Sequence, residues 1–455
     1  MKLSVAAIVE ATHASNSAST PSLPADTAFD GVSIDSREVT AGELFVPIVA
    51  LRDGHDFIDD ALTRGATGFL CRREHPLSNR PEALVVADTT IALQDLARAM
   101  RRRLPEKLAA ITGSVGKTST KDLTAAILRV HGPTIASAKS FNNELGVPLT
   151  LLNGPDDAWS GVLEMGARGT GHISFLCDIA RPTIGLITNI GSAHLEKFGS
   201  RDAIADAKSE LLASLPASGV GVLDRDGDLF DRLAARSSAP IVSFSATGDR
   251  RAPVVAEDIV VDHELRVRFR LLLHGESAVV ELGARGRHQV SNALGAATVA
   301  HHLGSSLGEI VDGLATTKLS PLRMEVLILA NTLTLLNDTY NANPVSMRAA
   351  LDALAGLGAT RRIAVLGTMA ELGDGSVDMH RSIADHAQSL DVDTVLSVNE
   401  PSYGVENFDS IEMALQALLA LDLGPGDALL VKGSRVAGLE RLVAAYKNSL
   451  QEEAI

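Results

Sequence analysis

The chain has 455 residues, more than one hydrophobic core usually organises, so two to four domains are expected. Hydrophobic residues make up 45% and charged residues 21%, as in a water-soluble globular protein. The 41 Lys and Arg are outnumbered by 56 Asp and Glu, and the resulting net charge of −15 argues against non-specific nucleic-acid binding.

The first predicted block covers residues 1–82 and mixes short strands with helices. Its strand-like pieces are "GVSIDS" and "ELFVPIV", and "FIDDALTRGA" reads as a helix. The stretch "HPLSNRPEA" is rich in turn residues and is predicted to be a linker.

The second block, residues 83–319, alternates strand-like runs with helical patterns, as in "LAAITG", "SGVLEMG", "TIGLITNIG" and "GVGVLD". Such alternation favours a largely parallel sheet covered by helices. Within it, residues 263–282 alternate apolar and charged side chains with period two, which predicts an antiparallel hairpin with one wet face. The third block, residues 320–455, repeats strand and helix and is predicted to be a small Rossmann-like domain. The expected class is therefore α/β in three domains, with a central P-loop-type parallel-sheet ATPase domain.

A glycine-rich turn, "ITGSVGKTST", follows the first strand of the second block. Gly113 and Gly116 allow backbone N–H groups to point inward, and the following helix N-terminus completes an anion cradle. Lys117 can reach the β- and γ-phosphates of a nucleotide, and Thr118 can offer a hydroxyl to Mg²⁺. The loop is a variant, because Ile111 stands where the usual motif has a glycine. A strand–turn–helix corner without a ligand is the structural alternative.

Two further residues are candidates for the same site, and a third is not. Glu164 ends the buried strand-like run "VLE", and His194 follows another such run in "ITNIGSAH". Because α/β sheets hold ligands at the carboxyl ends of their strands, the two are predicted to be metal ligands. Lys208, in "IADAKSELL", reads by itself as a solvated helical lysine. The adjacent His301 and His302 diverge on a helix and are interpreted as structural.

Two cysteines, Cys71 and Cys177, lie far apart in sequence and show no disulfide or zinc spacing, which suggests a reducing compartment. No run approaches the ~18 apolar residues of a membrane span. We therefore expect a cytoplasmic protein that binds neither membrane nor nucleic acid, with a monomer as the default state.

Several segments together resemble one family, the Mur ligases of peptidoglycan synthesis. The similar segments are "ITGSVGKTST", "KSFNNELGVPLTLL", "TNIGSAHLEKFGS", "AKSEL", "GRHQVSNALGA", "LNDTYNANPVSM", "VSIDSREVTAGELFV" with "DGHDFI", "MAELGD" and "VKGSR". The "TYNANP" segment is typical of the branch that joins D-alanyl-D-alanine to UDP-N-acetylmuramoyl-tripeptide. Three positions differ from the family pattern. Val115 replaces a common asparagine, the glycine that often precedes Arg323 is missing, and "VALRDGHDF" lacks the usual glycine before its loop.

The resemblance implies an ATP-dependent amide ligase that works through an acyl phosphate. It implies a small N-terminal α/β uridine-binding domain, ATP, two Mg²⁺ ions, and a Lys208 that is carbamylated by CO₂. The catalytic residues would be Lys117, His194 and Lys208. The metal ligands would be Thr118, Glu164, His194 and Lys208. The ATP-binding residues would be Gly113, Ser114, Val115, Gly116, Lys117, Thr118, Ser119, His288, Asn292, Arg323 and Asp338.

The resemblance also implies substrate contacts on three domains, so that the site is complete only when the domains close. The uridine-diphosphate end would meet Ser33, Asp35, Ser36 and Arg37. The acceptor peptide would face Asn142 and Asn143. The dipeptide or the hinge would involve Tyr340, Asn341 and Asn343.

Other functions share some of these features. A MurE-type ligase would add a single amino acid with the same chemistry, and a folylpolyglutamate synthase would lack the N-terminal segments. A P-loop ATPase switch would have an apolar strand ending in aspartate as its second metal motif, whereas "VLEMG" offers Glu164. A non-catalytic nucleotide-binding module would not need His194 with Lys208. The third residue of the acceptor tripeptide, meso-diaminopimelate or L-lysine, stays open.

Overall fold

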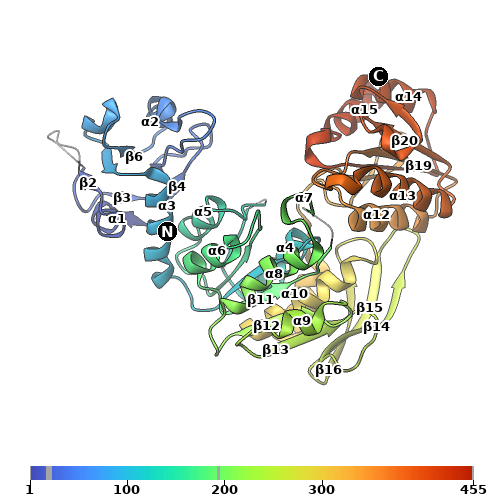
Figure 1. Cartoon of the computed structure of the whole chain (residues 1–455), viewed down its shortest axis with the longest axis horizontal. Helices are drawn as coiled ribbons and strands as arrows, with labels where there is room; N and C mark the ends of the chain where they lie inside the picture. The colour runs from blue at the N-terminus through green and yellow to red at the C-terminus, as the bar shows by residue number, and fades with distance from the viewer. Residues whose placement is uncertain (1, 17–22, 139, 192–194, 453–455) are drawn as a thin grey trace.

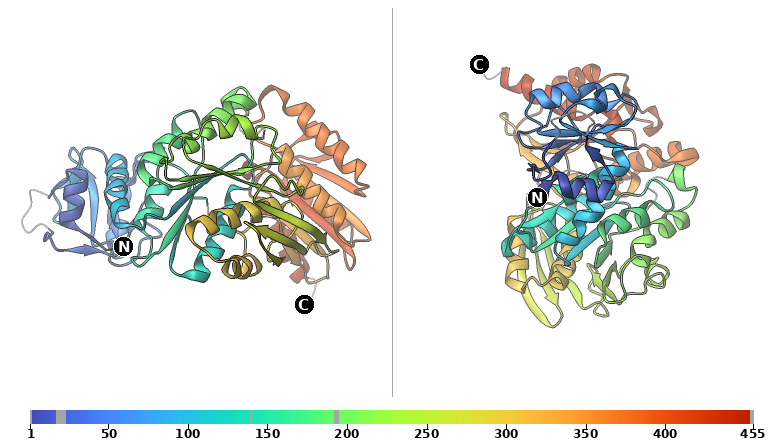
Figure 2. Two further views of the ribbon diagram at one scale, coloured as in Figure 1. Left: turned by 90° about the horizontal axis from the view of Figure 1, so that it is seen from below. Right: turned by 90° about the vertical axis from the view of Figure 1, so that its left-hand side faces the viewer.

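The computed structural model describes residues 2–16, 23–138, 140–191 and 195–452. The chain forms three lobes in sequence order, with the central one between the other two (Figure 1). The same succession along the long axis is visible from below (Figure 2). The three-domain α/β fold predicted from the sequence is therefore confirmed. Within the described ranges, no helix combines the length and the apolar composition that crossing a bilayer requires.

The N-terminal domain is built on a five-stranded sheet in the order β2-β7-β6-β5-β4, parallel except for β2. Its strands are β2 (Ser15–Asn16), β4 (Val32–Ser33), β5 (Leu44–Phe45), β6 (Gly68–Arg72) and β7 (Ala83–Val86), and a two-stranded ladder joins β1 (Leu3–Ser4) to β3 (Ala28–Phe29). Its α-helices are α1 (Val5–Thr12), α2 (Ile58–Thr63) and α3 (Thr89–Met100).

The first predicted domain boundary, at residue 82, falls inside this sheet. β7 is fully buried and pairs in parallel with β6, so the N-terminal sheet extends to Val86. The turn-rich segment predicted as a linker contains a 3₁₀ turn, η2 (Pro76–Asn79), that connects two strands of one sheet. Turn residues mark a change of chain direction, and that change occurs within a domain as readily as between domains.

The central domain contains a nine-stranded sheet in the order β16-β15-β14-β13-β12-β11-β8-β10-β9. The strands from β8 to β14 run parallel, and β15 and β16 form the antiparallel hairpin predicted for residues 263–282. The strands are β8 (Leu108–Thr112), β9 (Thr134–Ala136), β10 (Ser160–Glu164), β11 (Ile184–Ile187), β12 (Val220–Asp224), β13 (Ile241–Ser245), β14 (Val254–Val261), β15 (Val267–Leu273) and β16 (Glu276–Leu282). The helices are α4 (Lys117–His131), α5 (Gly146–Leu152), α6 (His172–Ala180), α7 (Leu195–Phe198), α8 (Arg201–Ala213), α9 (Phe230–Ala234), α10 (Gln289–Leu303) and α11 (Leu307–Thr316).

Two apolar clusters cover the central sheet. One joins α4, α10 and α11 to the strands, and the other continues through α3, α5 and α6 into the N-terminal domain. Because each cluster consists of apolar side chains removed from water, burial is the main source of stability here. The cluster that includes α3, α5 and α6 contains residues of both domains, so it holds the N-terminal domain against the central domain.

The C-terminal domain has a six-stranded sheet in the order β17-β18-β22-β19-β20-β21, parallel except for β17. Its strands are β17 (Glu325–Ile328), β18 (Thr334–Asp338), β19 (Arg361–Gly367), β20 (Thr394–Val398), β21 (Glu406–Phe408) and β22 (Asp427–Lys432). The helices are α12 (Pro344–Gly356), α13 (Ser376–Ser389), α14 (Ile411–Ala420) and α15 (Glu440–Glu452). This is the Rossmann-like arrangement predicted for the third block.

Candidate active site

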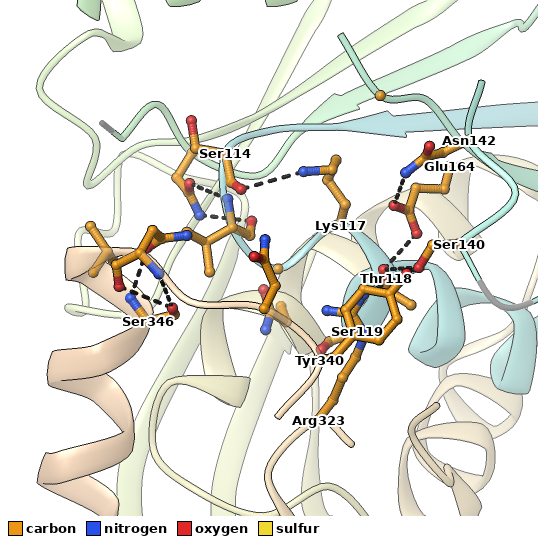
Figure 3. A pocket seen from close by; sticks show the side chains of 18 of the residues that line it. Ser114, Lys117, Thr118, Ser119, Ser140, Asn142, Glu164, Arg323, Tyr340 and Ser346 are labelled. Atoms are coloured by element: carbon orange, nitrogen blue, oxygen red, sulfur yellow. Dashed lines mark hydrogen bonds between the residues drawn. The ribbon is translucent and has the colours of Figure 1, made fainter. Parts of the chain in front are cut away.

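A cavity of about 370 Å³ lies between the central and C-terminal domains. The central domain supplies one wall of the cavity. This wall comes from the glycine-rich loop, the segments after β10 and β11, and the inward faces of α8 and α10. The C-terminal domain supplies the opposite wall, which comes from the segment before β17, the carboxyl ends of β18 and β22, and the start of α12. Figure 3 shows these side chains converging from both domains. The strand ends of the central and C-terminal sheets therefore face each other across one concave site.

The glycine-rich loop connects buried β8 to α4. Gly116 adopts a left-handed conformation with φ +83°, and a Cβ there would lie 2.4 Å from the side-chain oxygen of Asn292. At Gly113 a Cβ would lie 1.9 Å from Thr188 Oγ1. Glycine is required at both positions, because any side chain would push neighbouring residues out of the loop.

Two residues that the sequence analysis did not single out hold this loop in shape. Thr188 Oγ1 donates to the carbonyl of Val115 at 2.6 Å, and Asn189 Oδ1 accepts from the Val115 N–H at 3.0 Å. Both directly follow β11, which pairs with β8. The rule that strand ends carry functional side chains could have pointed to them.

Lys117 is the first residue of α4 and lies inside the loop. Its Nζ donates to the carbonyl of Gly113 at 2.8 Å and to the carbonyl of Ser114 at 3.3 Å, the second of which is drawn in Figure 3. Burial lowers the pKa of this amine, while the nearby Glu164 carboxylate favours its charged form. The lysine thus places a positive charge beside the helix N-terminus, where anions are already favoured.

Glu164 is the buried acidic residue at the carboxyl end of β10, as predicted. Its side chain accepts one hydrogen bond from Thr118 Oγ1 at 2.6 Å and another from Asn142 Nδ2 at 2.7 Å (Figure 3). Ser140 Oγ lies 3.5 Å from Thr118 Oγ1. This cluster of hydroxyl and carboxylate oxygens is the donor set that Mg²⁺ prefers.

Lys208 is buried on α8, with 1% of its surface exposed, and it lines the cavity. The interpretation as a solvated lysine, which the local sequence favours, is therefore wrong. Burial, together with the charge of Lys117, lowers the pKa of the Lys208 amine well below its ordinary value. Among the described residues, no carboxylate forms an ion pair with it.

The proposed metal set is only partly visible. His194 lies outside the described residues, and the part of the chain that the structure describes contains no cluster of three or more His, Cys, Asp or Glu arranged for a metal ion. Thr118, Glu164 and Lys208 all line the same cavity.

The predicted adenine side lies at the start of α10. His288 is the N-cap residue of this helix, and burial lowers its pKa. Asn292 accepts from Thr120 Oγ1 at 3.2 Å and donates to Gln289 Oε1 at 2.8 Å, so its amide is fixed by protein contacts. Both His288 and Asn292 line the cavity.

Beside them, the Ser291 hydroxyl donates to Asp224 at 3.0 Å. Burial raises the pKa of the Asp224 carboxyl from 3.8 to about 6, although this bond and the Asp226 N–H oppose the shift. The folded state therefore holds the proton more tightly than the unfolded state. The stability linked to this group is fully present below about pH 4 and is lost as the pH rises to about 6.

Asp224→Asn should therefore be stabilising above pH 6 by about 1 to 3 kcal/mol relative to the native chain, and by little at pH 4. The measurement is urea unfolding at several pH values. Asp249→Asn is the contrasting control, because Arg251 lowers the pKa of Asp249 to about 2 and its contribution is lost on acidification instead. A stability difference for Asp224→Asn that stays constant between pH 4 and 7 would contradict the shift.

Arg323 and Tyr340 contribute the C-terminal wall. Arg323 Nη2 donates to Ser140 Oγ at 3.2 Å, and its guanidinium lies 4.0 Å from the centre of the Tyr340 ring. Leu322 and Met324, on either side of Arg323, have φ of +64° and +48°. The family's usual glycine before the arginine thus corresponds to a left-handed position that leucine occupies here at a cost in backbone strain.

Asp338 is predicted to reach the nucleotide. Its carboxylate accepts hydrogen bonds from Lys432 Nζ at 2.5 Å and from the Met324 N–H at 3.1 Å. Lys432 is 1% exposed and also donates to the carbonyl of Asn341 at 2.9 Å. Lys432 belongs to the "VKGSR" segment that resembles the family, but no role was predicted for it. Its position as the last residue of a buried strand was the available signal.

Two of the predicted substrate residues accept hydrogen bonds from backbone N–H groups at the starts of helices, at the cavity edge. Asn143 Oδ1 accepts from the N–H groups of Leu145 and Gly146 at the start of α5, and Asn343 Oδ1 accepts from the Ser346 N–H in the capping box of α12. Each amide oxygen is used to begin a helix, which is a common role of asparagine.

The residues predicted to meet uridine diphosphate lie apart from this cavity. Ser33 ends β4 of the N-terminal domain, and Asp35, Ser36 and Arg37 follow it; none of the four residues lines the cavity. The Arg37 guanidinium donates two hydrogen bonds to Asp35, at 2.9 and 2.6 Å, and the Arg37 N–H donates a third at 3.0 Å; together they lower the pKa of that carboxyl to about 2.

Three family models match consecutive parts of the chain. Their descriptions are "Mur ligase family, catalytic domain" for residues 28–106, "Mur ligase middle domain" for residues 111–300, and "Mur ligase, glutamate ligase domain" for residues 322–435.

Curated relatives carry the name UDP-N-acetylmuramoyl-tripeptide–D-alanyl-D-alanine ligase. The Escherichia coli protein is 36% identical over 93% of this chain and 95% of its own length. The Mycobacterium tuberculosis protein is 38% identical over 90% of each chain.

Solved structures of similar proteins point to the same family. MurF from Acinetobacter baumannii superposes with a TM-score of 0.88 at 30% identity, covering 98% of this chain and 99% of the other. MurF from Thermotoga maritima, determined in complex with ADP, gives a TM-score of 0.80 at 28% identity and covers 93% and 98%. With the motifs, the fold and the relatives in agreement over almost its whole length, the chain belongs to the Mur ligase family of ATP-dependent ligases.

Proposed function

We propose that this chain joins D-alanyl-D-alanine to UDP-N-acetylmuramoyl-tripeptide and converts ATP to ADP and phosphate. The observation that carries the proposal is the cavity itself. It holds the phosphate-binding loop, the Glu164 carboxylate and the Lys208 amine of one domain opposite Arg323, Asp338 and Lys432 of the next. The relatives named for this reaction support the choice of substrates.

The reaction has to make a carboxylate reactive toward an amine. A carboxylate is inert at neutral pH because its leaving group would be oxide or hydroxide. Its attack on the γ-phosphate of ATP releases ADP and gives an acyl phosphate, from which phosphate can leave. Two anions meet in this step, so positive charge at the transferred group lowers the barrier. Lys117, held between the loop carbonyls, is the residue placed to supply it.

The residues around Glu164 fit a magnesium ion. Thr118 and Glu164 would hold one Mg²⁺, and a second would use His194 and a carbamylated Lys208. Such ions, when bound, would neutralise phosphate charge and orient the acceptor carboxylate. The buried Glu164 carboxylate, within 2.6 Å of the Thr118 hydroxyl, supports the first assignment.

Carbamylation of Lys208 needs a neutral amine. The amine nitrogen would attack the carbon of CO₂, form an N–C bond and lose one proton, which leaves a carbamate anion. The burial of Lys208 and its lowered pKa support this step, because both favour the neutral amine.

Further assignments belong to the same proposal. His288, Asn292, Arg323 and Asp338 would contact the nucleotide together with residues 113–119 of the loop, and Asn142 and Asn143 would face the acceptor. Tyr340, Asn341 and Asn343 would serve the dipeptide or the hinge, and residues 33–37 would bind the uridine end. The boundaries of the family matches support a domain division near residues 107–110 and 301–321. A cytoplasmic monomer stays a prediction.

The test is phosphate release with ATP, Mg²⁺ and UDP-N-acetylmuramoyl-tripeptide, supplied with one amine at a time. D-alanyl-D-alanine is expected to stimulate release and to give the pentapeptide product by mass spectrometry. D-glutamate, diaminopimelate and lysine should not. Stimulation by a single amino acid would favour the MurE-type alternative, and release that ignores every amine would favour an ATPase switch. Repeating the assay with diaminopimelate- and lysine-containing tripeptides identifies the natural acceptor.

A further inference from the structure

One contact between the central and C-terminal domains lies away from the cavity, at α7. The short helix α7 meets the segment 368–375, which connects β19 to α13. The Glu196 N–H donates to the carbonyl of Glu371 at 3.3 Å, and Lys197 Nζ forms an ion pair with the Glu371 carboxylate. Figure 1 shows α7 on the side of the central domain that faces the C-terminal domain.

The segment 368–375 is held firmly by its own domain. The Met369 N–H donates to Nε2 of the buried His380 at 2.9 Å, and the Ala370 N–H donates to Ser434 Oγ at 2.9 Å. Glu371 itself adopts φ +63°, a left-handed conformation that is costly for glutamate. Strained residues of this kind persist only where surrounding contacts enforce them, and they cluster at functional sites. Here the strained residue is the one that contacts α7 through both its backbone and its side chain.

On the central side, α7 leads directly into the helix that carries Lys208. Ser200 caps α8 by accepting from the Ala203 N–H at 3.1 Å, and Arg201 donates to the carbonyl of Ile190 at 3.0 and 3.2 Å. The α7 contact therefore attaches the C-terminal domain to the element that forms one wall of the cavity.

The covalent connection between the two domains lies elsewhere. It runs through residues 317–324, where the Ser320 N–H donates to the Asp122 carboxylate of α4 at 2.7 Å. The α7 contact is thus an independent attachment, made by other elements, and it restricts rotation about the connection.

We infer that Lys197 and Glu371 form a latch that keeps the C-terminal domain closed while the acyl phosphate waits for the dipeptide. This inference rests on the proposed function. In the productive step the dipeptide amine attacks the acyl carbon, a C–N bond forms, the C–O bond to phosphate breaks, and the amine loses a proton. In an open site water attacks the same carbon, which regenerates the carboxylate and releases phosphate. The net result is then ATP hydrolysis without amide formation. Glu371 is a positioning residue, because it does not line the cavity.

The experiment measures phosphate released per amide formed, together with KM for each substrate, in Lys197→Met and Glu371→Gln. The wild type is expected to release one phosphate per amide. Both variants should exceed one, and their KM for D-alanyl-D-alanine should rise roughly two- to fivefold, the range for a partly exposed ion pair. Arg251→Met is the matched control, because it removes an ion pair that lies within the central domain.

The charge-reversed double variant, Lys197→Glu with Glu371→Lys, separates a latch from an unrelated structural effect. It is expected to restore the phosphate-to-amide ratio toward one and to lower KM for the dipeptide. A phosphate-to-amide ratio of one together with an unchanged KM for the dipeptide in both single variants would overturn the latch. A double variant that is as defective as the single variants would overturn it too. A wild-type protein that forms no amide with D-alanyl-D-alanine would instead overturn the proposed function.

Discussion

Lys208→Ala is expected to reduce kcat for amide formation by about 10²- to 10³-fold, because it removes the buried group proposed to become an anion near the transferred phosphate. Stability should change little or rise, because the buried amine has no carboxylate partner among the described residues and its burial is costly. The measurements are steady-state phosphate release and thermal unfolding. An unchanged melting temperature with lost turnover would separate chemistry from folding.

Short carboxylic acids provide the specific control for this variant. Acetate or propionate could enter the space of the missing side chain and supply a carboxylate in place of the proposed carbamate. Partial recovery of turnover in Lys208→Ala, rising with acid concentration and absent in the wild type, is the expected result. A fully active Lys208→Ala would refute the carbamate role.

Glu164→Gln is expected to lower turnover by roughly 10²-fold at ordinary Mg²⁺ concentrations and to raise the Mg²⁺ concentration needed for half-maximal rate. Glutamine keeps the volume of the side chain and one acceptor oxygen for Thr118 or Asn142, but it removes the negative charge. Folding should therefore be affected much less than catalysis. The measurement is a Mg²⁺ titration of phosphate release, with unfolding followed in parallel.

Glu144→Gln is the matched control for this variant. Glu144 pairs with Arg168 at 3.3 Å on the exposed side of the site and lies outside the Thr118–Glu164 cluster. Its loss should leave the Mg²⁺ dependence unchanged. Added acetate should not rescue Glu164→Gln, because no side-chain space is vacated. An unaltered Mg²⁺ dependence in Glu164→Gln would remove Glu164 from the metal site.

Contacts between distant segments gave several residues roles that the sequence alone did not reveal. Asn143 and Asn343 line the cavity, but each also begins a helix, which the sequence did not separate from substrate binding. Lys432 went unassigned because its partner Asp338 lies 94 residues away along the chain. The ion pair that joins Lys197 to Glu371 spans 174 residues and was equally invisible.

The sequence by itself determined the three-domain α/β class, the phosphate-binding loop and the position of Glu164 at a strand end. These features are local: residue periodicity, the glycines at 113 and 116, and the order of strand, turn and helix decide them within about 20 residues. Only the tertiary structure decided that Lys208 is buried, that β7 belongs to the N-terminal sheet, and that the two strand-end sites face one cavity. The physical reason is that burial and the pKa of a side chain depend on which distant elements fold around it.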